Sequence, residues 1–157
     1  MRRVLWTLGA VALMQIAVPA LASPCPPNVT EAALHAHAGA VANECKQETE
    51  DGKLLYEVKV TLKDGKRLEL EVDPDGTILL TEERIELAAV PPAVMTAFAA
   101  KFPGAKATAA EKQTAANGNV TYELAFGAGA TQKETTFTAD GKPVKEPDDA
   151  EDEEGQD

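Results

Sequence analysis

The stretch that decides the fold is YEVKVTLKDGKRLELEV, residues 56–72. On both sides of Asp64-Gly65, apolar side chains alternate with charged or polar ones. Such alternation predicts strands with one face on a core and the other in water, and Asp-Gly is typical of a tight hairpin turn. We therefore expect an antiparallel hairpin whose outward face serves for interaction. The side chains predicted on that face are Glu57, Lys59, Lys63, Glu69 and Glu71.

A helix is expected before each group of strands. The pairs Pro26-Pro27 and Pro91-Pro92 suit the first turn of a helix, where backbone N–H groups lack partners. Asn28, with Glu31 three residues later, has the spacing of a capping box. Further along the chain, Asp73-Pro74-Asp75-Gly76 resembles the opening of a calcium loop, but it lacks the later ligands and is better interpreted as a hairpin turn.

An internal repeat organises the chain. Residues 25–40 align without gaps to residues 90–105 with six identities, and later matches extend a period of about 65 residues. We expect an α+β fold of two tandem repeats, residues 23–84 and 85–145. In each repeat, one helix would pack on its own three- or four-stranded antiparallel sheet. Exposed edge strands would also allow the two sheets to join.

The N-terminus has the pattern of a secretion signal. Arg2 and Arg3 precede an apolar run over residues 4–18, and small residues follow at Ala20-Leu21-Ala22. We expect a signal peptide over residues 1–22, cleaved near Ala22, and a periplasmic or secreted bacterial protein with no membrane insertion after cleavage.

The chain is strongly acidic. It has 26 Asp and Glu against 15 Lys and Arg, a net charge of -11. Such a chain repels phosphate backbones, which argues against nucleic acid as a partner. The last twelve residues, EPDDAEDEEGQD (146–157), have no apolar side chain larger than alanine. They are predicted to form a disordered acidic tail.

Cys25 and Cys45 are the only cysteines. An even number in an exported chain favours a disulfide between them. Two free thiols, or an intermolecular bridge through Cys25, remain open alternatives.

Residues for catalysis are scarce. The two histidines, His35 and His37, are two apart on a predicted helix, so their side chains diverge and cannot chelate one ion together. No nucleophile–histidine motif and no phosphate-binding glycine motif is present. We expect no enzymatic activity, no cofactor and no metal site.

The second repeat carries VPPAV, KFPGA, NGNVTYE and ADGK in order between residues 90 and 142. In these motifs it resembles the PepSY-like, beta-lactamase-inhibitor-like family of small exported domains, and residues 26–83 look like a diverged copy. The resemblance implies a non-enzymatic module that binds an exported or envelope protein, as an inhibitor or regulator of a protease or other hydrolase.

Tight interfaces usually rely on buried Trp, Tyr or Arg anchors. Without residues 1–22, the chain has no Trp, and its only arginines are Arg67 and Arg84. We therefore expect weaker binding than that of a nanomolar inhibitor. The alternative is an acidic structural or weakly calcium-buffering envelope protein without a specific interface.

Overall fold

The computed structural model describes residues 25–50 and 52–144. The predicted signal peptide (1–22) and the predicted acidic tail (146–157) lie outside the described residues. Within the described part of the chain, no helix has the length and apolar character needed to cross a bilayer.

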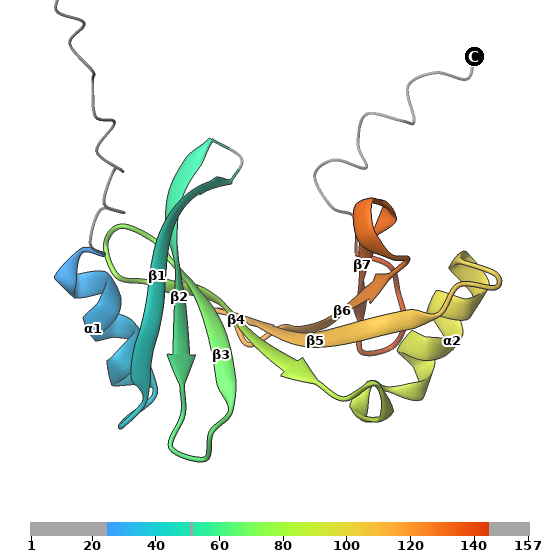
Figure 1. Ribbon diagram of the computed structural model, residues 1–157, viewed down its shortest axis with the longest axis horizontal. Coiled ribbons are helices and arrows are strands. Elements are labelled where there is room, and N and C mark those ends of the chain that lie inside the picture. The colour runs from blue at the N-terminus through green and yellow to red at the C-terminus, as the bar shows by residue number, and fades with distance from the viewer. Residues whose placement is uncertain (1–24, 51, 145–157) are drawn as a thin grey trace, which may run out of the picture.

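Each of the α-helices α1 and α2 precedes a group of strands (Figure 1). The elements in chain order are α1 (Pro27–Ala36), β1 (Val41–Glu50), β2 (Lys53–Thr61), β3 (Arg67–Val72), β4 (Ile78–Ile85), the 3-10 helix η1 (Leu87–Ala89), α2 (Pro92–Lys101), β5 (Ala107–Ala115), β6 (Val120–Phe126), the 3-10 helix η2 (Gly129–Thr131) and β7 (Lys133–Thr138).

The seven strands of residues 25–50 and 52–144 form one antiparallel sheet in sequence order, β1 to β7. The prediction of two tandem repeats, each with its own three- or four-stranded sheet, is therefore wrong. The cause is β4, which pairs with β3 on one side and with β5 on the other, where its residues 80–85 lie opposite residues 110–115. The repeat boundary expected after Arg84 falls one residue before the end of β4.

Both helices cover the same face of this sheet. Leu70 is paired with Thr81, Thr81 with Thr114, and Thr114 with Val120, and directly paired residues project to the same face. The first helix packs on the Leu70 side and the second packs on Leu124, which shares the face of Val120. We call this the inner face. The opposite side, the outer face, carries no helix among the described residues.

Two separate apolar clusters lie under the two helices. The first comprises Val29, Ala33, Val58, Val60, Leu68, Leu70 and Val72. The second comprises Val90, Val94, Phe98, Ala110, Leu124, Phe126 and Phe137. On β4, Ile78 packs on the first cluster and Ile85 on the second, while Thr81 and Glu83 lie between them. This polar middle keeps the clusters apart, and Figure 1 shows the helices at opposite ends of the sheet.

The start of α1 differs from the sequence prediction. The N-cap residue is Pro26, without a side-chain capping bond, so the capping box at Asn28 is wrong. The Asn28 side-chain amide instead donates to the Pro74 carbonyl oxygen at 2.8 Å, which ties α1 to the turn between β3 and β4.

That turn is a hairpin turn, as predicted. Asp73 Oδ1 accepts from the backbone N–H groups of Asp75 and Thr77, and Asp75 Oδ1 accepts from the Thr77 N–H and hydroxyl. Gly76 has φ 93°, a conformation that glycine adopts without strain. The turn's own donors thus occupy these two carboxylate oxygens. In residues 25–50 and 52–144, no group of three or more acidic, His or Cys side chains is placed to hold a metal ion.

A disulfide bond joins Cys25 and Cys45, whose Cα atoms are 5.9 Å apart. It links the residues before α1 to the middle of β1, across a sequence separation of 20 residues. Of the alternatives left open by the sequence, the structure thus shows the intramolecular bond.

Replacing both cysteines (Cys25→Ser with Cys45→Ser) is expected to lower the free energy of unfolding by about 3 kcal/mol, because the open loop gives the unfolded chain more conformations. Urea unfolding at neutral pH measures the change. The wild-type protein treated with a reductant serves as the matched control and should show the same loss. A difference below about 0.5 kcal/mol in both would contradict a stabilising role for the bond.

Candidate functional site

The outer face is a broad polar surface whose side chains align in rows across the strands. Its centre is dominated by acidic residues, which we call the glutamate cluster. The cluster consists of Glu57, Glu69, Glu71, Glu82, Glu111 and Glu123. Each of these residues is paired across the strands with another glutamate of the cluster. Glu82 is also paired with Gln113, which lies on the same face of β5 as Glu111, so all six side chains share one face.

Like charges oppose each other within the glutamate cluster. Three pairs lie directly opposite on neighbouring strands: Glu57 with Glu71, Glu69 with Glu82, and Glu111 with Glu123. Like charges in directly opposed positions destabilise a sheet. The fold therefore tolerates an electrostatic cost on this face, in addition to the cost of partly burying the carboxylates.

Lys59 partly compensates one side of the cluster. Its Nζ lies 3.1 Å from a Glu57 carboxylate oxygen and 3.1 Å from one of Glu69. Hydrogen bonds to Glu69 and Glu57 hold the pKa of Lys59 well above its ordinary value. Because the amine is largely solvated, these pairs contribute little to stability, but they fix the spacing of the two carboxylates.

Gln113 links two carboxylates on the other side of the glutamate cluster. Its Nε2 donates to Glu82 at 2.9 Å and to Glu123 at 3.1 Å, while the Thr121 hydroxyl donates to its Oε1 at 3.0 Å. Burial raises the pKa of Glu82, and the charge of Glu111 adds to the rise, whereas the hydrogen bond from Gln113 opposes it. The amide thus holds two carboxylates together without neutralising either of them.

Glu71 has no such support. Its carboxylate forms no hydrogen bond or ion pair with another described residue, and burial raises its pKa to about 7, with the charges of Glu50 and Glu82 adding to the effect. Burial also raises the pKa of Glu111, where Glu69 adds to the shift. Glu71 therefore titrates close to neutral pH.

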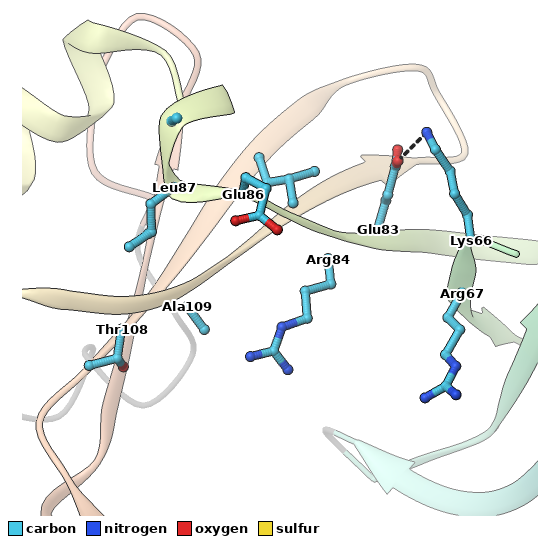
Figure 2. A pocket seen from close by; sticks show the side chains of 10 residues that line it. Lys66, Arg67, Glu83, Arg84, Glu86, Leu87, Thr108 and Ala109 are labelled. Atoms are coloured by element: carbon cyan, nitrogen blue, oxygen red, sulfur yellow. Dashed lines mark hydrogen bonds and ion pairs between the residues drawn. The ribbon is translucent and has the colours of Figure 1, made fainter.

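A hollow of about 520 Å³ lies beside the cluster, where β3 begins and β4 ends. Figure 2 shows Lys66 paired with Glu83, 2.8 Å apart, on one side, while Arg67 and Arg84 project to the other side. Neither arginine forms an ion pair with a described residue, although Arg84 lies opposite Glu111 on β5. The lining of the hollow thus carries charges of both signs, including Arg67, Arg84 and Glu86.

The structure brings four of the five predicted interaction residues together. Glu57, Lys59, Glu69 and Glu71 lie on the outer face of β2 and β3. Lys63 lies in the turn after β2, and its Cε occupies the space that a Cβ at Gly39 would need, beside the end of α1.

Sequence reasoning missed the half of the cluster supplied by β4, β5 and β6. These residues are Glu82, Glu111 and Glu123. Residues 81–84 (TEER) are all polar, so periodicity does not show which of them face outward. Glu111 and Glu123 indicated no shared surface with β2 and β3 as long as β4 and β5 were assigned to different sheets.

Comparison with solved structures shows that this fold has been seen before. A protein described as periplasmic from Bacteroides eggerthii matches with TM-score 0.62 at 17% identity, over 78% of this chain and 88% of that one. A DUF2874 family protein from Bacteroides uniformis matches with TM-score 0.60 at 17% identity, over 76% and 86%. A BLIP-like protein from Bacteroides fragilis matches with TM-score 0.57 at 18% identity, over 78% and 85%.

These likenesses show a BLIP-like fold, and at such low identity they show the fold alone. No protein-family model and no curated protein matches the sequence. The link to PepSY-like domains stays a prediction.

Stability is expected to fall as pH rises from about 4.5 to about 7. In that window the folded protein holds a proton at Glu71 that the unfolded chain has released, and the stabilisation is lost once pH passes the folded pKa of about 7. Glu71→Gln should flatten this dependence and raise stability above pH 7. Urea unfolding at several pH values measures it.

The control is Glu31→Gln, an exposed carboxylate on α1. It should leave the pH dependence unchanged. Glu82 and Glu111, whose pKa values are also raised, act in the same direction and keep some dependence in the Glu71 variant. Identical pH profiles for Glu71→Gln and wild type would contradict the assignment.

Proposed function

We propose that this chain is an exported, non-enzymatic module that binds a basic surface of another envelope or secreted protein with the outer face of its sheet. The partner class that we propose is a protease or other hydrolase, which the module inhibits or regulates.

The observation that carries this proposal is the glutamate cluster on a sheet face that no described helix covers. Directly opposed glutamates and half-buried carboxylates reduce stability. Proteins retain such costs mainly where function requires them. A surface of this kind attracts a positively charged partner and speeds its association.

The class of partner is supported by the comparisons and the sequence. The structural neighbours include a protein described as periplasmic and one described as BLIP-like. The disulfide between Cys25 and Cys45 fits an oxidising compartment outside the cytoplasm, in agreement with the predicted signal peptide. The motifs shared with PepSY-like and beta-lactamase-inhibitor-like domains favour the inhibitory role.

A second function is favoured by the net charge of -11. On this alternative the chain is an acidic structural or calcium-buffering envelope protein without a specific interface. Since the carboxylates of the β3–β4 turn accept the turn's own hydrogen bonds, weak calcium binding would then rest on the acidic residues of 146–157.

The test is affinity capture from a cell-envelope extract of the source organism, with residues 23–157 as bait at moderate salt. We expect one hydrolase to be recovered by the wild type and by Glu31→Lys, and at least about tenfold less of it by Glu69→Lys. Both variants change the net charge equally, but only Glu69 lies in the glutamate cluster.

A bait of residues 23–145 separates the two functions. Equal recovery by this bait supports the binding module, and inhibition of the recovered hydrolase can then be assayed directly. Recovery that requires residues 146–157 and disappears at moderate salt would instead support the acidic buffering protein.

A further inference from the structure

A second hollow lies in a corner of the sheet away from the arginines. The strand β2 begins at Lys53, but its first partner in β3 is reached only at Tyr56, opposite Val72. The β1–β2 hairpin therefore projects beyond β3, as Figure 1 shows. Between the projecting hairpin and the β3–β4 turn lies a hollow of about 510 Å³, a volume within the range of ligand sites.

The walls of this hollow are unusually apolar for an exposed surface. Three large apolar side chains are exposed among the described residues, and two of them, Leu54 and Leu79, each 39% exposed, line it. Leu55 and Pro74 complete the apolar part of the lining. Exposed apolar groups gathered at one place, with a charged rim, mark a binding surface.

The rim is acidic. Glu50, Glu71 and Asp73 line the hollow together with a single amine, that of Lys53. Asp73 Oδ1 is occupied by hydrogen bonds of its own turn, whereas the half-buried Glu71 carboxylate has no bonded partner among the described residues. The hollow thus offers an aliphatic wall beside an unpaired carboxylate.

On the premise of the proposed function, we infer that this hollow is the anchor site for the partner. It receives a Lys or Arg side chain of the partner, next to an aliphatic residue of the partner. The stem of a long cationic side chain packs on apolar surface while its charged end reaches a carboxylate. Leu54, Leu55 and Leu79 provide that surface, and Glu71 accepts the charge-assisted hydrogen bond. The leucines also favour an organic cation over a metal ion, which binds only through oxygen, nitrogen or sulfur ligands.

Binding at this hollow depends on pH. A cation is bound more tightly by ionised Glu71, whose pKa burial raises to about 7, so affinity rises as pH rises through that value. The charged groups that act on Glu71 or share the hollow are Glu48 and Glu50 on β1, Lys53 and Glu57 on β2, Asp73 in the turn and Glu82 on β4.

The experiment measures fluorescence polarisation of a labelled acetyl-Gly-Leu-Lys-Leu-Gly-amide peptide against residues 23–157. We expect saturable binding at pH 8 that weakens about tenfold in Glu71→Gln and in Leu79→Ser. Matched controls are Glu44→Gln, an exposed outer-face carboxylate, and Val41→Ser, the third exposed apolar side chain, which is 61% exposed. Both controls should bind as wild type does.

The pH profile provides a second readout. Wild-type affinity should increase between about pH 6 and about pH 8, and Glu71→Gln should bind equally at both values. The inference is overturned by absence of saturable binding, by equal binding of a peptide with Glu in place of Lys, or by unchanged affinity in Glu71→Gln and Leu79→Ser.

Failure of this inference differs from failure of the proposed function. A captured partner that is lost by Glu69→Lys but retained by Glu71→Gln and Leu79→Ser would refute the anchor and leave the proposed function standing. Peptide binding with the expected losses, but no partner captured by wild type, would support the hollow as a site for basic amphipathic groups and refute the proposed function.

Discussion

The pairing of β4 with β5 is the interaction on which the rest of the structure depends. Six consecutive residue pairs, from Leu80 opposite Ala115 to Ile85 opposite Ala110, join the strands β1–β4 to the strands β5–β7. The pairing also covers two strand edges that would be exposed in separate sheets. Because Ile78 and Ile85 of β4 enter different apolar clusters, the same strand holds both helices in place.

The outer face exists as one surface only because of this pairing. Glu57, Glu69 and Glu71 come from β2 and β3, and Glu82 and Glu111 come from β4 and β5. In two separate sheets, these carboxylates would not be held on one continuous face. Burial raises the pKa values of Glu82 and Glu111, and charges from across the β4–β5 pairing add to both shifts, since Glu111 acts on Glu82 and Glu69 acts on Glu111.

Local patterns in the sequence predicted local structure well. The alternation in residues 56–72 predicted the β2–β3 hairpin and the outward placement of Glu57, Lys59, Glu69 and Glu71, and the proline pairs predicted where both helices begin. The even cysteine count and the predicted export favoured the disulfide between Cys25 and Cys45, which the structure shows.

What the sequence did not predict depends on contacts between distant segments. Periodicity shows which face of a strand is apolar, but it does not identify the neighbouring strand. The internal repeat therefore suggested two sheets where pairing makes one. In the same way, Asn28 does not form the predicted capping box, because its side chain donates to Pro74, 46 residues away. Lys63 does not lie on the outer face of β2, because it belongs to the following turn and its side chain lies beside Gly39.

On the proposed function, the glutamate cluster and the hollow at Leu54 and Leu79 act on different steps of binding. Charges in the partly buried glutamate cluster would attract a basic partner over a distance, but at physiological salt their effect fades beyond about 8 Å, so they would govern mainly the association rate. Contacts of a bound side chain with Leu54 and Leu79 are short-range and insensitive to screening, so they govern dissociation. Since the described part of the face offers no Trp, this division would let an acidic sheet bind its proposed partner weakly yet associate with it quickly.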